Sequence, residues 1–241
     1  MAEVVVYGIA GVVYGLGLWA NGRRFALKKI RGQFRRALYL DVEYEYRIEE
    51  QDSSATIKLE RHGSILMEYT FEWESWEPAA SQGAAAMEAQ FTALETANMD
   101  TEVPTDKTDI DYSVNFQALD EFVGLYPLDF RQLPFEQFLS LLWSSYQVGM
   151  VWPGAQALYT GFDFRYSEAG ENAILHLDKQ RHRFDDRFNM ATISAGNKDC
   201  KLNMTAFFRP RPVEYSMAAI EAEIQPDESL AAKRVLVLGA S

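Results

Sequence analysis

An internal repeat constrains this 241-residue chain more than any other feature of its sequence. When the sequence is offset against itself by 132 positions, aromatic residues and glycines of the first part fall on those of the second. Each copy runs from an apolar helix through a Tyr-x-x-Gly element and a glycine turn into strands. We therefore expect the α+β class, with a central helix wrapped by a curved antiparallel sheet, present twice. The matched pairs are Tyr14 with Tyr146, Gly17 with Gly149, Gly22 with Gly154, Ile30 with Phe162 and Phe34 with Tyr166.

Local patterns predict the elements of each copy. The opening stretch "VVVYGIAGVVYGLGLW" lacks a basic leader and falls short of the roughly 20 residues of a membrane span, so it predicts a buried helix. Alternating apolar and polar residues predict antiparallel strands in "VEYEYRI" and "ATIKLER", followed by a turn at His62 and Gly63. In the second copy, "FNMATISAGNKDCKLNMTAFF" is typical of a hairpin with Gly196 and Asn197 at its turn.

The organisation of the chain follows from the repeat. We expect a first unit over 1–77, a linker over 78–107, a second unit over 108–215, and a further segment over 216–241. The second unit has a lead-in before its helix, whereas the first begins at the helix itself. A unit without its first strand leaves a sheet edge unpaired. Either an upstream part of a longer chain supplies that strand, or the first unit is reduced.

Composition excludes several classes of function. A net charge of -12 argues against nucleic acid as the main partner. The single cysteine, Cys200, cannot form an internal disulfide and fits a reducing cytoplasm. The sequence holds no Cys/His cluster for a metal and no complete glycine-rich phosphate loop. We therefore expect a cytoplasmic protein without a metal, a membrane span or a cofactor in this segment.

The helix of the second unit carries a family resemblance. In "YPLDFRQLPFEQFLSLLWSSYQVGMVW", Pro134 opens the helix, and Trp143 and Trp152 follow Ser140 by three and twelve positions. This pattern resembles the β-hydroxyacyl thioester dehydratases of fatty-acid synthesis and the dehydratase domains of polyketide synthases. The resemblance implies a tandem, or double, hotdog fold. It also implies a 3-hydroxyacyl or enoyl thioester substrate on an acyl carrier protein or coenzyme A, with Pro134, Tyr146, Trp152 and Gly154 at the substrate.

The two catalytic positions of that family are substituted in this chain. The resemblance places the catalytic His at Tyr126 and the helix acid at Ser140; in the first unit the acid position is Tyr7. A tyrosine with a pKa near 10 is a poor base, and serine is neither acid nor base at neutral pH. Neither unit therefore carries a competent pair, and an active enzyme would need a His from upstream of Met1. The alternative is a non-catalytic double hotdog that binds thioesters or dimerises beside a reductase.

Other titratable residues have ordinary explanations. Glu136 and Asp129 could be displaced acids, but a glutamate in the first turn of a helix ordinarily complements the helix dipole. His62 is expected in a solvated turn, His176 on the face of Asp178, and His182 in a charged surface stretch. The spacing gives none of the three histidines a carboxylate partner, so we assign them no catalytic role.

A basic segment interrupts this acidic chain between Arg23 and Arg36. It contains seven cations and no acid, which favours an anionic partner, with Lys28, Lys29 and Arg31 as candidates for a carrier protein or a phosphate. The alternative, which we favour, is charge pairing with a neighbouring Glu-rich strand, "DVEYEYRIEEQD". A homodimer is a further candidate partner.

The last residues, "RVLVLGAS", resemble the first strand and turn of a short-chain dehydrogenase/reductase domain. Later glycines and the following helix, which would hold a pyrophosphate, are not in this segment. The resemblance implies a neighbouring ketoreductase that uses NADP. Taken together, the sequence predicts a dehydratase-like domain of a larger fatty-acid or polyketide biosynthetic protein.

Overall fold

The computed structural model describes residues 5–6, 8–39, 41–77, 103–114, 119, 124, 126–128, 132–154, 157–170, 172 and 174–209, and these residues define the fold. The chain divides into two compact units, Met1–Arg209 and Pro210–Ser241. The predicted reductase strand and most of the predicted linker lie outside the described residues, as do the candidate residues Tyr7 and Asp129.

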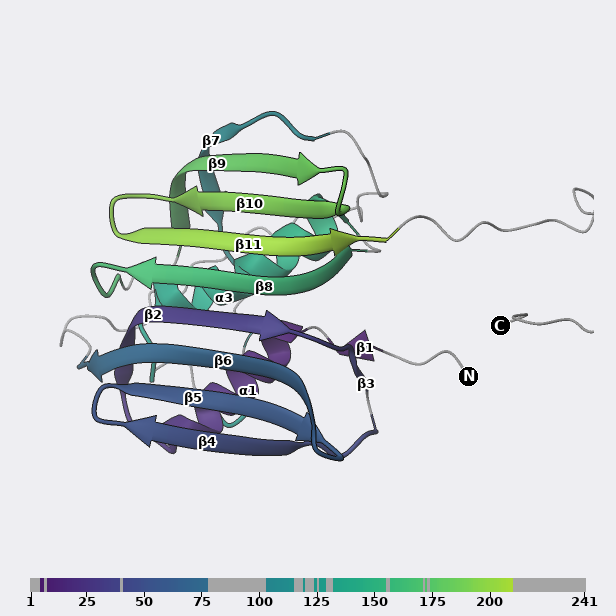
Figure 1. The fold of residues 1–241 in the computed structure, drawn as a ribbon. Coiled ribbons are helices and arrows are strands. Elements are labelled where there is room, and N and C mark those ends of the chain that lie inside the picture. The colour runs from purple at the N-terminus through teal and green to yellow at the C-terminus, as the bar shows by residue number, and fades with distance from the viewer. Residues whose placement is uncertain are drawn as a thin grey trace, which may run out of the picture. The chain divides into compact units, whose positions relative to one another are not determined.

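A nine-stranded antiparallel sheet forms the first unit, in the order β4-β5-β6-β2-β8-β11-β10-β9-β7. Both long helices lie behind this sheet, on the same face (Figure 1). The predicted α+β class, a large antiparallel sheet with helices, is therefore confirmed. The first part of the chain supplies β2 (Phe25–Phe34), β4 (Glu45–Gln51), β5 (Ser54–Arg61), β6 (Ser64–Ser75) and a short pair, β1 (Val5–Val6) with β3 (Leu38–Tyr39). The second part supplies β7 (Lys107–Tyr112), β8 (Ala157–Tyr166), β9 (Leu175–Asp185), β10 (Met190–Gly196) and β11 (Cys200–Phe208).

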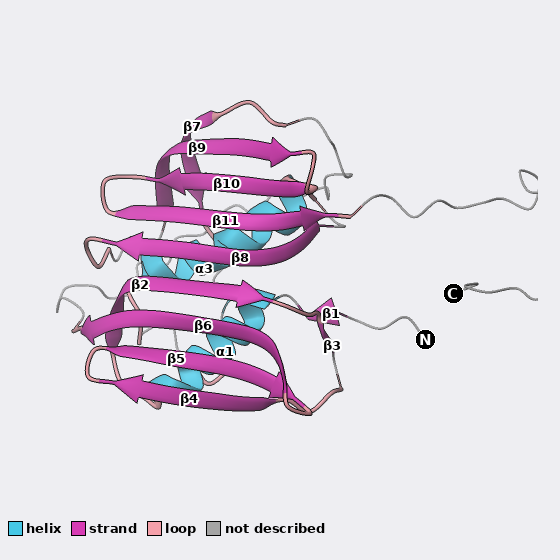
Figure 2. Cartoon of the chain, viewed as in Figure 1, coloured by secondary structure: helices cyan, strands magenta, loops and turns pink. Residues whose placement is uncertain are grey.

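The first helix, α1 (Gly8–Ala20), lies behind the strands of the first part (Figure 2). Its glycines let aromatic side chains of the sheet approach its backbone. Tyr69 on β6 donates a hydrogen bond to the carbonyl of Val12 over 3.1 Å, and Tyr46 on β4 donates to the carbonyl of Gly11 over 3.0 Å. A side chain at Gly15 would collide with the hydroxyl group of Tyr69 and the ring of Tyr46. The glycine-rich apolar stretch is thus the buried helix that the sequence predicts.

The second helix, α3 (Phe135–Tyr146), begins at Pro134 and continues into a π-helical turn, η1 (Gln147–Val151). Proline suits this position because its missing N–H would have no partner in the helix. The buried side chain of Gln137 makes two hydrogen bonds to the backbone of Leu27 on β2. Its oxygen accepts from the N–H of Leu27 over 2.8 Å, and its nitrogen donates to the carbonyl of Leu27 over 2.9 Å. This amide therefore joins the helix of the second part to a strand of the first.

The internal repeat appears in the pairing of the two central strands. The bounds of β2 and β8 differ by the same 132 positions as the sequence match. Lys29 pairs with Arg165 and Gln33 with Gly161, while Arg31 pairs with Asp163, its own repeat equivalent. The two copies are thus related by an approximate two-fold axis through the Arg31–Asp163 pair. Counted outward from this axis, the strand order is β2-β6-β5-β4 in the first copy and β8-β11-β10-β9 in the second, so equivalent strands occupy equivalent places, as a duplication requires.

The two ends of the sheet differ in the way that the sequence predicts. In the second copy, β7 from the lead-in pairs with β9 and forms the outer strand. In the first copy β4 is the last strand among the described residues, and its side chains are largely exposed and charged. The predicted hairpins are also confirmed: His62 and Gly63 join β5 to β6 with positive φ values of 50° and 75°, and Asn197 follows the end of β10. No helix among the described residues is long and apolar enough to cross a membrane.

Candidate functional site

Ser140, at the expected acid position, lies in the middle of α3 and is fully buried. Its hydroxyl donates to the carbonyl of Gln137 over 2.7 Å and lies 2.5 Å from the phenol oxygen of Tyr166 on β8. Burial raises the pKa of Tyr166 well above its ordinary value, so the phenol stays neutral. Two neutral hydroxyls that bind each other offer no acid–base chemistry at neutral pH.

Tyr126, at the expected His position, lies against the first copy. Its ring is edge-on to Tyr14 on α1 at 6.2 Å, and Tyr14 in turn stacks on Tyr46 at 5.5 Å. Burial raises the pKa of Tyr126 as well, which makes the phenol less able to ionise and serve as a base at neutral pH. The structure therefore gives Tyr126 and Ser140 different surroundings, one in an aromatic cluster and the other against β8.

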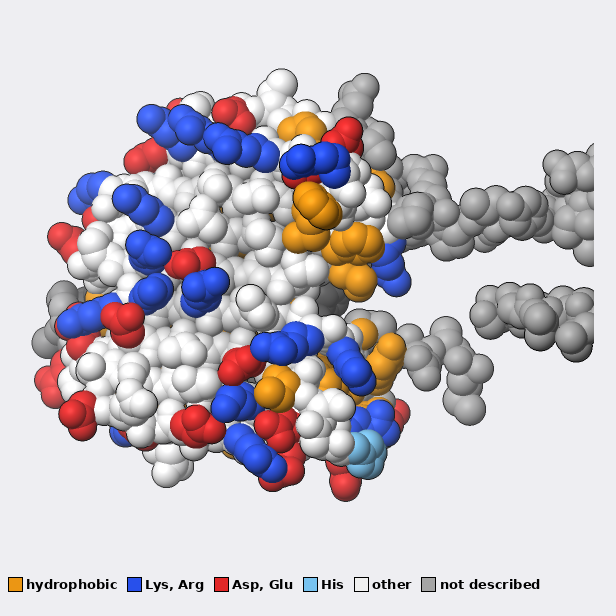
Figure 3. Space-filling model, viewed as in Figure 1, with side chains coloured by type: hydrophobic (Ala, Val, Ile, Leu, Met, Phe, Trp, Pro, Cys, Tyr) orange, Lys and Arg blue, Asp and Glu red, His pale blue; other side chains and the backbone are white. Residues whose placement is uncertain are grey.

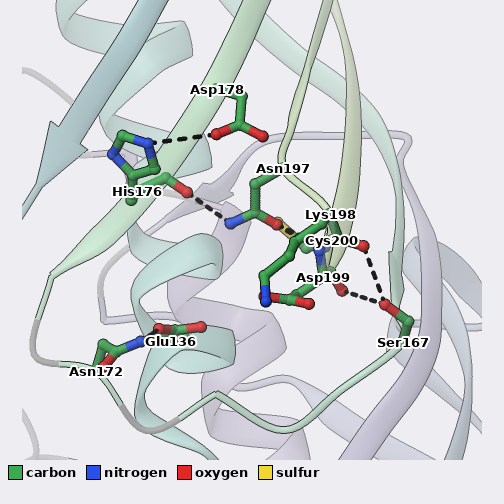
Figure 4. Close-up of polar contacts among 9 residues, drawn as sticks. All are labelled: Glu136, Ser167, Asn172, His176, Asp178, Asn197, Lys198, Asp199 and Cys200. Atoms are coloured by element: carbon green, nitrogen blue, oxygen red, sulfur yellow. Dashed lines mark hydrogen bonds and ion pairs between the residues drawn. The ribbon is translucent and has the colours of Figure 1, made fainter.

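Glu136 lies one turn before Ser140 on the same face of α3, because residues four apart on a helix are neighbours. Its carboxylate accepts a hydrogen bond from the side chain of Asn172 (Figure 4). It also lies against the backbone of Gly170. Burial is the main cause that raises the pKa of this carboxyl group. A small cavity of about 10 Å³ adjoins it, lined among others by Tyr166 and Cys200. That volume is at the lower limit for one water molecule.

The turn between β10 and β11 closes this region. The side-chain oxygen of Asn197 accepts from the backbone N–H groups of Asp199 and Cys200, both over 2.8 Å, and Ser167 donates to the carbonyl of Asp199 over 3.1 Å (Figure 4). Burial raises the pKa of the Cys200 thiol to about 11, so it is not a thiolate nucleophile at neutral pH. Glu136 is therefore the group of this region best suited to proton transfer, because its raised pKa lies closer to neutral pH.

The residues expected at the substrate lie at the two ends of α3. Pro134 is buried at the start of the helix, where its carbonyl accepts from Gln137 and Phe138. At the far end, Tyr146 stacks on Tyr112 of β7 at 5.5 Å, and Gly154, with a φ of 101°, donates to the carbonyl of Val148. Trp152 is buried, and among the described residues its indole N–H and the amide nitrogen of Gln147 have no hydrogen-bond partner.

The surface placement expected for His182 is wrong. The side chain is only 6% exposed and lies edge-on to Trp152 at 5.3 Å, with the amide nitrogen of Gln180 at 3.0 Å from Nε2. Burial lowers its pKa, so the imidazole is neutral. The reason is alternation along β9, which turns Arg181 and Arg183 outward and His182 inward. That alternation was available in the sequence, but the flanking arginines obscured it.

His176 and His62 are both exposed. His176 has two carboxylate neighbours that the sequence spacing did not suggest: its Nδ1 lies 2.8 Å from Asp111 on β7 and its Nε2 lies 3.3 Å from Asp178. The hydrogen bond with Asp111 is the main cause that raises the pKa of His176. Among the described residues, no three His, Cys, Asp or Glu side chains gather closely enough to hold a metal ion.

The expected charge pairing of the basic segment with the Glu-rich strand is found at Arg23, which lies 2.8 Å from Glu50 on β4, but the two segments are not adjacent strands. The strands adjacent to β2 are β6 and β8, because β4 pairs with β5 at the edge of the sheet. Only part of the segment is neutralised: Arg23 reaches Glu50, Lys28 reaches Glu74 and Arg35 reaches Glu68, at 2.8–3.0 Å. Within the described part of the chain, Lys29 and Arg31 form no such ion pair.

No protein-family model matches the chain, and no curated protein matches it. Similar solved structures include an acyl-CoA thioesterase II, TesB2, from Mycobacterium marinum, with 13% identity, a TM-score of 0.47 and coverage of 89% of this chain and 93% of that one. A tesB protein of Mycobacterium avium subspecies paratuberculosis has 12% identity, a TM-score of 0.44 and coverage of 86% and 88%. A MaoC-like dehydratase from Phytophthora capsici has 7% identity, a TM-score of 0.39 and coverage of 79% and 71%. At these values the similarities assign neither a family nor an activity to this chain.

Proposed function

We propose that this chain is a double hotdog that acts on 3-hydroxyacyl or enoyl thioesters, with Glu136 as its proton-transfer group. The observation that carries the proposal is a half-buried carboxyl group with a raised pKa on the central helix of the second copy. It lies one turn from Ser140, where the sequence resemblance places the acid. The duplicated arrangement of helix and sheet around the Arg31–Asp163 pair supports the double-hotdog assignment.

A single carboxylate can serve both proton transfers of a syn dehydration. Glu136 removes the α-proton of the 3-hydroxyacyl thioester, and the resulting carboxylic acid gives a proton to the departing β-hydroxyl group. The C–O bond breaks, water leaves, the enoyl thioester forms and the carboxylate is regenerated. A raised pKa suits this role because the group must act as base and then as acid near neutral pH.

Two unpartnered donors lie at the far end of α3, away from Glu136. A buried donor without a partner costs free energy, so each such group in a native protein needs an explanation. The indole N–H of Trp152 and the amide of Gln147 are two such donors among the described residues. Gln147 follows Glu136 by eleven residues, roughly 16 Å along a helix, so a thioester carbonyl bound by these donors would hold its α-carbon away from Glu136. These donors, and with them Trp152 in the substrate-binding role that the resemblance implies, therefore favour a bound thioester that Glu136 does not reach, as in the second candidate below.

The test is turnover by the full chain and by Glu136→Gln. Enoyl absorbance follows dehydration of a 3-hydroxyacyl thioester, and release of free thiol follows hydrolysis of an acyl thioester. We expect Glu136→Gln to lower kcat/KM by about 10²- to 10⁴-fold, the usual contribution of a general acid–base group. The matched control is Glu45→Gln, the same change on the exposed edge strand β4. Unchanged turnover in Glu136→Gln would remove this residue from the mechanism.

A second candidate is a thioester-binding module without catalysis. The observation that favours it is the pair formed by Ser140 and Tyr166, which occupies the family's acid position with neutral groups. Saturable binding of acyl-coenzyme A without turnover in either assay would support this function and overturn the first. An acyl carrier protein, an adjacent NADP-dependent ketoreductase, a homodimer and a cytoplasmic location remain parts of the proposal in either case.

A further inference from the structure

The outer face of the sheet, opposite the helices, carries a row of cations that the sequence order does not reveal. Lys29 on β2 pairs with Arg165 on β8, and Arg165 pairs with Lys201 on β11. These side chains point away from the core, because the residues beside them in each strand, Ile30, Phe164 and Leu202, are buried. Three like charges thus stand directly opposite one another on adjacent strands, which is an unfavourable arrangement in a free sheet.

Neutralisation of this row is incomplete. Arg165 lies 3.3 Å from Asp163, and Lys29 has Glu72 as its register neighbour on β6. Within the described residues, neither Lys29 nor Lys201 forms an ion pair. This surplus of positive charge stands in a chain of net charge -12. Figure 3 shows Lys and Arg side chains gathered over the middle and upper strands of this face, whereas acidic side chains are more frequent over the lower ones.

A hollow adjoins the row of cations. It has a volume of about 530 Å³, which is within the range of small-molecule sites. Gly161 lies at its floor, where the missing side chain leaves room between Gln33 and Thr205. Arg31 and Asn203 also line it, and each lies two positions along its strand from a member of the row, on the same face. Asp163 lines the hollow between Arg31 and Asn203, and the three cations of the row lie one same-face position beyond these residues, next to the hollow but not in its lining.

We propose that this outer face binds a nucleotide-sized ligand that carries two or more phosphate groups. The row spans three strands, or roughly 10 Å, which is longer than one phosphate needs. Lysine and arginine are the residues that bind phosphate groups, and amide side chains such as those of Asn203 and Gln33 suit the polar remainder of a nucleotide. The helices and Glu136 lie on the other face of the sheet. The site is therefore separate from the proposed thioester site and does not depend on it.

The test is titration calorimetry of the full chain with inorganic pyrophosphate, ADP and coenzyme A. We expect saturable binding of all three, with Arg165→Gln/Lys201→Gln weakening each by at least about tenfold through lost charge-assisted hydrogen bonds. The control is Lys198→Gln, an exposed cation outside the row, which should change binding less than twofold. Asn203→Leu, which narrows the hollow without a change of charge, should weaken ADP and coenzyme A more than pyrophosphate.

Three outcomes would overturn the proposal. The first is that none of the three probes binds saturably. A face that binds only an acidic protein would give this result. The second is equal binding by the double variant and the wild type. The third is competition with ADP by coenzyme A but not by pyrophosphate, which would mean that the row is not a phosphate site.

Discussion

The two faces of the central strand pair, β2 and β8, are made by the same stretches of sequence and have opposite characters. The inner face holds buried apolar side chains such as Ile30 and Phe164, packed toward the helices. The outer face holds Lys29, Arg31 and Arg165, close together and only partly neutralised. The inner face explains why the chain folds, and the outer face adds charge that folding does not need. Side chains that oppose stability are where function is expected, because selection for stability alone would remove them.

The largest test of this contrast replaces two adjacent residues of β8, one on each face. Phe164 is completely buried, and Phe164→Ala should reduce the free energy of unfolding by about 3–5 kcal/mol, through lost apolar burial and a residual cavity. Arg165→Ala should change it by no more than about 0.5 kcal/mol, as is usual for an exposed side chain. Urea unfolding of both variants measures the difference. Similar losses in the two variants would mean that the outer face also stabilises the fold.

Local patterns in the sequence were enough to predict the inner face. The 132-residue offset matches the bounds of β2 and β8, and alternation identifies which residues of β11 are buried. The outer face could not be predicted in the same way. Lys29, Arg165 and Lys201 are neighbours only because distant strands pair in one particular register. The sequence showed the cations of β2 but not those that the second copy adds to them.

The site around Glu136 was hidden for a similar reason. The sequence placed Glu136 correctly in the first turn of α3, where a solvated carboxylate is the ordinary expectation. Its pKa is raised by burial, to which Gly170 after β8 contributes, while the hydrogen bond from Asn172 acts in the opposite direction. Local helix rules do not include such contacts. Likewise, the sequence does not reveal that Gln137 would bind the backbone of Leu27 in the other copy.

A second test uses the two histidines of β9, which lie on opposite faces. Burial lowers the pKa of His182 on the inner face, with nearby Lys107 acting in the same direction and Asp106 opposing it. The unfolded chain then binds more protons than the folded one below a pH of about 6.5, so His182 should make the protein less stable as the pH falls. Each unit by which the pKa of His182 is lowered on folding corresponds to a loss of about 1.4 kcal/mol in the free energy of unfolding at a pH below both pKa values. His176 on the outer face has a raised pKa and should act in the opposite direction.

NMR titration of the imidazole protons measures the pKa values of His182 and His176. Urea unfolding at pH 7 and at pH 5.5 measures the resulting change in the free energy of unfolding. The variant His182→Asn should lose less stability over this interval than the wild type does. The control is His62→Asn in the exposed turn between β5 and β6, where asparagine tolerates the positive φ of 50°. A His182 resonance that titrates above about 6.5, the ordinary value, would contradict the buried, neutral imidazole.

The smallest expected effect concerns the outer face itself. Lys201→Gln removes one of three like charges that stand opposite one another on β2, β8 and β11. Without a ligand, this variant should be more stable than the wild type by about 0.2–1 kcal/mol at low ionic strength, because like charges on paired strands repel. In about 1 M salt the gain should nearly vanish, since the screening length falls to about 3 Å. With pyrophosphate present, the wild type should become more stable than Lys201→Gln, because a ligand gives the greater stabilisation to the protein that binds it more tightly. If Lys201→Gln is instead less stable than the wild type at low salt without ligand, Lys201 supports the fold. The row of cations would then contribute to stability, which contradicts the contrast between the two faces.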